Sequence, residues 1–221
     1  MAERASRTTA ATPLVAALIG AGMAWAGSQG GVTAGGVPVF ALAIALAFLV
    51  QWVVFVPSYL AQTERYFDLT GSLTYISVTV LAVVLSGPAG ARSWLLLALV
   101  LVWAGRLGTF LFRRVRRAGK DDRFDTIKQS LVRFLTTWTL QGLWVSLTLA
   151  AALAAITAGG DAPGIDVFAL AGLGVWLIGF TIEATADLQK SRFRADPANK
   201  GAFISTGLWA YSRHPNYFGE I

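Results

Sequence analysis

The fold of this chain is decided by residues 38–57, which read PVFALAIALAFLVQWVVFVP. The stretch carries no charge, and a helix needs roughly 20 such apolar residues to cross the hydrocarbon core of a bilayer. It lies inside a longer segment, residues 8–63, that contains no Asp, Glu, Lys, Arg or His. Backbone N–H and C=O groups in lipid must bond internally, so only helices and closed barrels span membranes. Because the segment is continuously apolar rather than alternating, it predicts helices.

The same pattern recurs in residues 69–91 and 134–160, which are also free of charge. Charged residues make up 14% of the chain and the mean hydropathy is +0.60, whereas soluble domains carry about 25% charged residues. We therefore predict an all-α fold, a polytopic transmembrane helical bundle that forms a single domain over residues 1–221. The predicted spans are residues 13–27, 38–57, 72–87, 93–112, 134–158 and 166–183, and a seventh begins near Tyr217.

Basic residues gather on one side of this predicted bundle. All of the 18 Lys and Arg residues lie on this side except two: Arg92 is on the other side, and Arg106 is within a span. The positive-inside rule then predicts a multi-pass protein of the cell membrane whose N-terminus and basic loops are cytoplasmic. The cytoplasmic part includes residues 113–133 and the region 184–221.

The first span has a second interpretation. Arg4 and Arg7 precede a short apolar stretch, and Ala24-Trp25-Ala26 resembles a signal-peptidase site, so the segment could be a cleaved signal. The other spans keep the same orientation in either case.

The composition excludes several functions. The chain has no Cys, so it can form no disulfide, thiolate nucleophile or Cys-bound metal site. His214 is the one histidine, and we predict no metal site because no second histidine stands at ligand spacing. The net charge of +6 does not indicate nucleic-acid binding, since no soluble basic module is present. The lipid bilayer is the expected partner of the chain.

An arginine within a span is costly in lipid and usually faces a bundle interior or a cavity. Arg106 stands in the sequence WAGRLGTFLF, about two turns from the cytoplasmic end, so snorkelling to the surface is an equal alternative. Arg113 is seven residues further on and shares its helix face. An anionic ligand that enters from the cytoplasm would meet both side chains.

Two further segments carry chemistry. Residues 62–75 join the second and third spans, and Thr70 or Ser72 could cap the third helix. In one interpretation this segment is an interfacial loop, with Glu64 and Tyr66 at the membrane surface. In the other, the Glu64 carboxylate and the Tyr66 phenol lie at the mouth of a cavity and could donate a proton to a carbonyl. Beyond the sixth span, Glu183, Asp187 and Lys190 form one stripe of a continued helix, either a solvated face or a site for ribose, amide and phosphate groups.

The last segment packs aromatic, basic and amide groups into residues 206–220, TGLWAYSRHPNYFGE. Pro215 is expected to open a helix, with Ser212 or His214 near its N-cap. This arrangement would direct backbone N–H groups and Arg213 toward an anion.

Four motifs taken together resemble a known family. These are ERYFDLTGSLTY at 64–75, RFD at 123–125, DLQK at 187–190 and YSRHPNYFGE at 211–220. They resemble bacterial membrane proteins grouped with the steroid 5-alpha-reductase C-terminal domain, over about residues 40–221. Isoprenylcysteine carboxyl methyltransferases and sterol reductases share the Arg-His-Pro element, and all of them look like one membrane superfamily.

The resemblance implies an NADPH-dependent reductase of a C=C bond conjugated to a carbonyl, acting on a steroid-like or other lipophilic small molecule. It implies that a carboxylate–tyrosine pair polarises the carbonyl, and the candidates are Glu64 with Tyr66 or Tyr75. The cofactor-contacting candidates are Arg106, Arg113, Glu183, Asp187, Lys190, Arg194, Tyr211, Arg213, His214, Asn216 and Glu220.

One departure from the family pattern concerns the C-terminus. Family members continue for one or two further helices past the last motif, so we expect this sequence to be C-terminally truncated. Two alternative functions stay open: an S-adenosylmethionine-dependent methyltransferase of a lipid or isoprenylcysteine-type substrate, and a non-enzymatic membrane protein. The surplus of arginine favours NADPH, which carries three phosphates.

Overall fold

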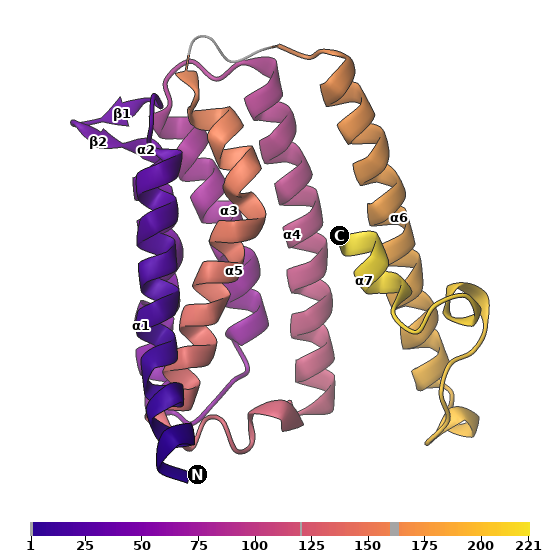
Figure 1. The fold of residues 1–221 in the computed structure, drawn as a ribbon. Coiled ribbons are helices and arrows are strands. Elements are labelled where there is room, and N and C mark those ends of the chain that lie inside the picture. The colour runs from indigo at the N-terminus through magenta and orange to yellow at the C-terminus, as the bar shows by residue number, and fades with distance from the viewer. Residues whose placement is uncertain (1, 120, 160–163) are drawn as a thin grey trace. The chain divides into compact units, whose positions relative to one another are not determined.

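The computed structural model describes residues 2–119, 121–159 and 164–221. Lys120, one of the basic residues of the predicted cytoplasmic loop, lies outside this described part. The chain forms two compact units, Met1–Gly164 and Ile165–Ile221, and each is described by itself. The predicted all-α architecture is confirmed, because long helices make up most of both units (Figure 1).

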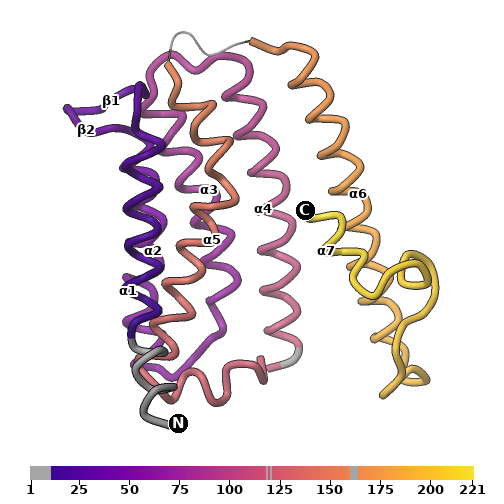
Figure 2. Tube along the Cα trace, in the orientation of Figure 1, coloured from indigo at the N-terminus to yellow at the C-terminus, as the bar shows by residue number. Residues whose placement is uncertain are grey.

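The described part of the first unit contains five α-helices, and Figure 2 traces the connections between them. They are α1 (Ala2–Gly27), α2 (Val39–Leu60), α3 (Phe67–Leu85), α4 (Ala91–Ala118) and α5 (Leu131–Thr157). A short antiparallel hairpin of β1 (Thr33–Ala34) and β2 (Val37–Pro38) stands between α1 and α2. Its turn needs Gly35 and Gly36, whose φ angles are +57° and +81°.

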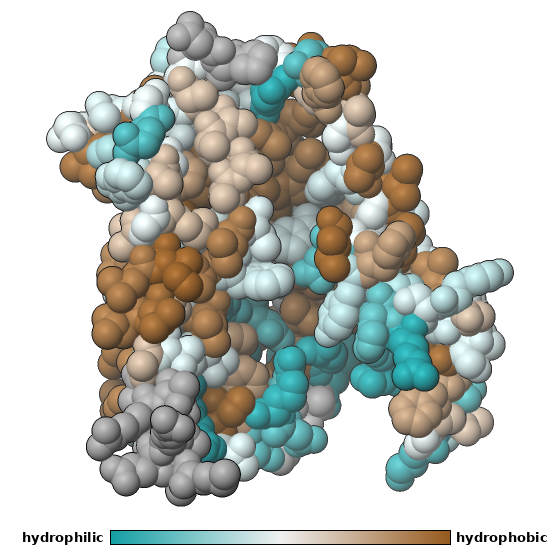
Figure 3. Space-filling view, viewed as in Figure 1, coloured by the Kyte–Doolittle hydropathy of each residue, from teal (hydrophilic) through white to brown (hydrophobic). Residues whose placement is uncertain are grey.

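Helices α2, α3, α4 and α5, together with α6 of the second unit, are long and apolar enough to cross a membrane. The apolar part of α1, Ala11–Gly27, is shorter. Figure 3 shows apolar side chains gathered on the outer surface of the first unit, as lipid contact requires.

Two predicted helix boundaries are wrong. Helix α2 continues through Pro57 to Leu60, since a proline near the end of a helix removes few of its hydrogen bonds. Helix α3 begins at Phe67 with Tyr66 as its N-cap, so neither Thr70 nor Ser72 caps it. Thr70 instead donates its hydroxyl to the carbonyl of Tyr66 at 2.7 Å.

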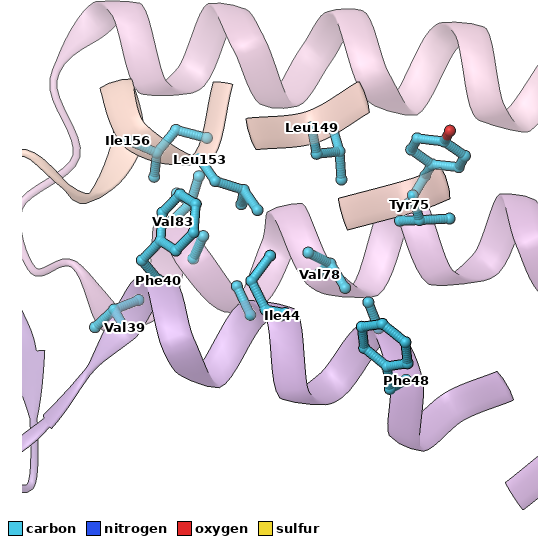
Figure 4. Close-up of a cluster of buried hydrophobic side chains, with 14 of the residues drawn as sticks. Val39, Phe40, Ile44, Phe48, Tyr75, Val78, Val83, Leu149, Leu153 and Ile156 are labelled. Carbon is cyan, nitrogen blue, oxygen red and sulfur yellow. The ribbon is translucent and has the colours of Figure 1, made fainter. Parts of the chain in front are cut away.

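The core of the first unit lies between α2, α3 and α5. Figure 4 shows its side chains: Val39, Phe40, Ile44 and Phe48 from α2, Tyr75, Val78 and Val83 from α3, and Leu149, Leu153 and Ile156 from α5. A polar pair interrupts this apolar core, because the fully buried Gln51 donates to Thr74 at 2.8 Å. Interhelical hydrogen bonds of this kind help to hold helices together in lipid.

The second unit is one long helix with a short C-terminal segment. Helix α6 (Val167–Ala195) begins at Asp166, which caps it by accepting from the N–H of Ala169. The predicted continuation beyond residue 183 is present, since the helix reaches Ala195. The 3₁₀ turns η3 (Pro197–Asn199) and η4 (Gly207–Ala210) lead to α7 (Pro215–Glu220). As predicted, Pro215 opens this last helix and His214 is its N-cap.

Candidate functional site

A buried carboxylate joins two loops at one end of the first unit. Glu64, in the loop between α2 and α3, is 6% exposed. One of its oxygens accepts a hydrogen bond from the backbone N–H of Asp121 at 3.0 Å, and the other accepts from Nζ of Lys128 at 2.7 Å. The loop between α4 and α5 therefore folds around one side chain, with an amide on one oxygen and an ammonium on the other.

Aromatic rings fix the same two loops. Phe124, in the 3₁₀ turn η1 (Asp122–Phe124), packs against Phe67 with ring centroids 5.1 Å apart, and Phe67 meets Trp138 edge-on at 5.1 Å. Phe67 and Glu64 belong to one connection of the chain, and Phe124 and Asp121 to the other. The polar contacts and the rings therefore hold the same junction together.

The partners of Glu64 also set its ionisation. Burial alone would raise the pKa of Glu64, but the hydrogen bonds from Lys128 and the Asp121 amide outweigh burial, so the pKa lies below its ordinary value. The Arg123 side chain lowers the pKa of Asp121 by donating to its carboxylate. Glu64 is therefore ionised at neutral pH and accepts hydrogen bonds rather than donating a proton.

The two tyrosines predicted beside Glu64 lie in different environments. Tyr66 is exposed, and its ring stacks on Phe112 with centroids 6.4 Å apart. Tyr75 is buried, with its hydroxyl 2.7 Å from that of Thr148. At 1.5 Å per residue it stands about 12 Å along α3 from the first turn, so the structure does not join its hydroxyl to Glu64. The catalytic roles of all three residues stay predictions.

Arg106 and Arg113 lie on the side of α4 that faces away from α3. Helix α4 meets α3 through Ala104 and Gly108, where a Cβ on Gly108 would stand 2.6 Å from Cβ of Ser72. Arg106 is two residues from both Ala104 and Gly108, which is about half a turn around the helix, so it lies on the opposite side. Its guanidinium lies 5.6 Å from the ring centre of Phe110. The predicted approach of Arg106 to residues 206–220 concerns both units and stays a prediction.

In the second unit the C-terminal motif folds against α6. The backbones of Gly219 and Gly179 come so close that a Cβ on Gly219 would stand 2.5 Å from the Gly179 carbonyl oxygen. This approach covers the α6 stripe, where Glu183 is 2% and Asp187 6% exposed. Asn216 of α7 donates to the Asp187 carboxylate over 3.4 Å, a long hydrogen bond. The structure thus brings three predicted site residues together.

Lys190, the next residue of the predicted stripe, is held by an aromatic ring. Its Nζ lies 4.5 Å from the ring centre of Trp209, a cation–π contact. The indole N–H of Trp209 donates to the carbonyl of Ala186 at 3.0 Å. The turn η4 is also tied to α6 through Gln189, which accepts from the N–H of Leu208 at 3.0 Å.

The other predicted cofactor residues of this unit lie on its surface. The exposed set is Arg194, Tyr211, Arg213, His214 and Glu220. The His214 ring stacks on Tyr217 with centroids 5.4 Å apart. Within the described part of the chain, Arg194 and Arg213 take part in no ion pair.

Sequence reasoning missed Lys128, Asp121 and Trp209. Lys128 entered only as a basic residue that sets topology, because nothing in a single sequence connects it to a glutamate 64 positions away. The motif at residues 123–125 was the signal in the sequence that could have pointed to Asp121 and Lys128. It marks this loop as part of the resemblance but gives the neighbouring residues no role.

These features define a polytopic helical membrane protein with a polar loop junction and a folded C-terminal motif. The chain belongs to the family described as "Protein of unknown function (DUF1295)", whose model matches residues 54–221. The match covers both Glu64 and the C-terminal motif. No curated protein and no solved structure matches the chain significantly.

Proposed function

We propose that this protein is a membrane-embedded, NADPH-dependent reductase of a C=C bond conjugated to a carbonyl in a lipophilic substrate. Two arguments support the proposal: the resemblance carried by the four motifs, all within the family match, and the folding of the last motif onto the buried stripe of α6. The contact between Asn216 and Asp187 is the observation that carries it, because it gathers residues that the resemblance assigns to the cofactor.

The chemistry of the available donors fits NADPH. Phosphate groups need cations that are accessible and not already neutralised, and within the described residues Arg194 and Arg213 of the second unit meet both conditions. Hydroxyl and amide groups need carboxylate and amide partners, which Asp187 and Asn216 can supply. Bound NADPH would supply a hydride to the substrate.

The protein must also stabilise the negative charge that develops on the carbonyl oxygen and deliver a proton. Glu64 is a poor donor because it is ionised and both its oxygens have partners. In our proposal it holds the loop junction, and a tyrosine hydroxyl, from Tyr66 or Tyr75, donates to the carbonyl.

Calorimetry with the purified chain tests the cofactor. Arg213→Ala should weaken NADPH binding by about 1.5–3 kcal/mol, the usual contribution of a hydrogen bond to a charged group. Lys200→Ala is the matched control, because Lys200 is exposed in the same unit but outside the C-terminal motif. Binding of S-adenosylmethionine in place of NADPH, or equal effects of the two variants, would contradict the proposal.

Turnover separates the tyrosines. With a panel of conjugated enones and NADPH, phenylalanine at the proton-donating tyrosine should lower kcat by roughly 10²–10⁴ with unchanged NADPH affinity. Tyr66→Phe and Tyr75→Phe serve as each other's control, because we expect kcat to fall in one variant and to stay unchanged in the other. If neither change lowers turnover, the proposed proton donor is wrong.

A further inference from the structure

The last two turns of α4 carry three arginines that we call the α4 patch: Arg113, Arg116 and Arg117. All three side chains are exposed. They stand at positions i, i+3 and i+4 of one helix, so their charges lie close together. Arg114, between them in the sequence, is turned toward α3, where its guanidinium lies 3.7 Å from the Asp68 carboxylate. The α4 patch is therefore a local concentration of positive charge.

Within the described residues, no carboxylate pairs with the arginines of the α4 patch. Two carboxylates of the neighbouring loops are already used, since Glu64 pairs with Lys128 and Asp121 with Arg123. The carbonyls at the end of α4 attract cations, but the dipole of a helix amounts to only about half a charge. Three arginine charges exceed what this end of the helix can offset.

The sequence around the α4 patch supplies no net negative charge. Residues 60–70, 113–119 and 121–133 hold eight basic and five acidic residues. Lys120, outside the described part, is basic as well, and residues 1–10 hold two arginines and one glutamate. The surplus of positive charge at this end of the first unit is therefore left for a partner.

The α4 patch stands at the depth of the lipid head groups. The predicted span, residues 93–112, has 20 residues and is about 30 Å long, which is the thickness of the hydrocarbon core. Arg117 is five residues further along the helix, about 7.5 Å, and the head-group layer is roughly 5–8 Å thick on each side. The exposed Tyr66 ring, stacked on Phe112, lies where interfacial aromatic residues are found.

We propose that the α4 patch binds the phosphate head group of an anionic membrane lipid. Guanidinium groups bind phosphate oxygens through paired hydrogen bonds and stay charged at physiological pH. Clusters of about 4–8 basic residues directly cytoplasmic of a span are typical of anionic-lipid binding, and residues 113–120 hold five. A lipid fits better than a soluble phosphate compound, because its acyl chains hold the phosphate at this depth.

This proposal does not rest on the reductase activity. Arg113 is also a candidate for contact with the cofactor, so the variants that test the lipid site leave it unchanged. They replace Arg116 and Arg117, to which the resemblance assigns no role.

Native mass spectrometry of the full chain in detergent measures lipid binding directly. Phosphatidylglycerol is added stepwise, with phosphatidylcholine as the zwitterionic comparison. The chain should bind phosphatidylglycerol more tightly, and this preference should shrink as the salt concentration rises. In Arg116→Gln/Arg117→Gln the half-saturating phosphatidylglycerol concentration should rise about thirtyfold, which corresponds to roughly 1 kcal/mol for each arginine.

Arg65→Gln/Arg133→Gln is the matched control. It also removes two exposed arginines from the predicted cytoplasmic end of the first unit, but neither belongs to α4. The half-saturating concentration of this control should rise less than about threefold, because charges outside the site act only through solvent. Equal rises in the two double variants would show diffuse attraction in place of a site and would overturn the proposal, as would equal affinity for the two lipids.

Two competition experiments separate the lipid from other phosphates. Inorganic phosphate or NADPH, added in excess, should leave phosphatidylglycerol bound. Displacement by inorganic phosphate would show a site for free anions, and displacement by NADPH would assign these arginines to the cofactor; either result contradicts the lipid site. Should the double variant fail to fold, Arg116→Gln and Arg117→Gln are tested singly, each with an expected rise of about fivefold. Unchanged binding in both single variants would equally overturn the proposal.

Discussion

At the residue scale, Lys128 supplies the charge that balances the buried Glu64 carboxylate. Its own side chain is 19% exposed, so the ion pair is largely shielded from water. Removing one member of such a pair leaves a buried charge without its partner, which costs more than the intact pair contributes. In the same loop the side chain of Arg123 is 65% exposed, so solvent screens its pair with Asp121 and this pair contributes less.

We therefore predict that Lys128→Met lowers the free energy of unfolding by about 3 kcal/mol. Glu64→Gln should cost less, about 1–2 kcal/mol, because the new side-chain carbonyl still accepts from the Asp121 amide. Arg123→Met is the control from the same loop and should cost less than about 1 kcal/mol. Denaturant unfolding in detergent measures all three, and equal losses for Lys128→Met and Arg123→Met would refute the structural role of the pair.

The lowered pKa of Glu64 predicts how this contribution depends on pH. A carboxylate whose pKa is lower in the folded chain stabilises the fold fully above its ordinary pKa, which is near 4.5. The contribution is lost as the pH falls through the lower, folded-state value. Unfolding midpoints of the unaltered chain and Glu64→Gln should differ by a constant amount at neutral pH and converge in acid. A difference that grows on acidification would show that the pKa of Glu64 is raised instead.

At the element scale, two close helix contacts depend on glycine. Helices α3 and α4 meet where Gly108 faces Ser72, and α6 and α7 meet where Gly179 faces Gly219. Without a side chain the backbones approach closely, and packing rather than hydrophobic burial holds helices together in lipid. Each contact has a matched glycine on the same helix where an added Cβ would meet no atom within 4 Å, Gly105 on α4 and Gly174 on α6.

For the first contact, Gly108→Ala should destabilise the first unit by about 1–3 kcal/mol, because the new methyl would overlap Cβ of Ser72. Gly105→Ala should be neutral or stabilising by up to about 1 kcal/mol, since alanine favours the helix and has open space around it. Thermal unfolding of the two variants side by side measures the difference. A loss of the same size in both would mean that the α3–α4 contact does not limit stability.

For the second contact, Gly219→Ala should release α7 from α6, because the methyl would overlap the Gly179 carbonyl oxygen and the Glu183 N–H. Hydrogen exchange should then become faster at the amides of α7 and at Trp209, while Gly174→Ala leaves them unchanged. Unaltered protection in Gly219→Ala would show that the C-terminal motif is not held by this close approach.

The hydropathy of the sequence predicted the helices of this chain, but it placed helix boundaries wrongly where a helix ends in polar residues. Residues 67–71 look like a loop in the sequence because Asp68 and Thr70 interrupt the apolar pattern, yet they form the first turn of α3. The junction around Glu64 covers that turn, and long-range contacts of this kind leave no periodic signal. The α6 stripe was predictable because its residues share one helix, whereas the contacts of Glu64 with Lys128 and of Asp187 with Asn216 join distant segments.

At the scale of the whole molecule, the position of the basic residues in the first unit predicts how the chain is oriented in a membrane. Residues 113–119 and 121–133 close the end of the unit that holds Glu64. The hairpin β1–β2 is at the other end, where the N–H of Val32 bonds the carbonyl of Thr157 at the end of α5. Moving the basic loop across a membrane is strongly disfavoured. We infer that the Glu64 end is cytoplasmic.

Because the chain has no cysteine, single substitutions can report this orientation without removing native thiols. Thr33→Cys and Thr126→Cys form a matched pair, since both threonines are exposed and they stand at opposite ends of the first unit. A membrane-impermeant maleimide added to intact cells should label Thr33→Cys, and it should label Thr126→Cys only after the membrane is permeabilised. Equal labelling of both after permeabilisation is the control for reactivity. Labelling of Thr126→Cys in intact cells would reverse the orientation, place the basic loop outside, and remove the cytoplasmic access that the NADPH proposal requires.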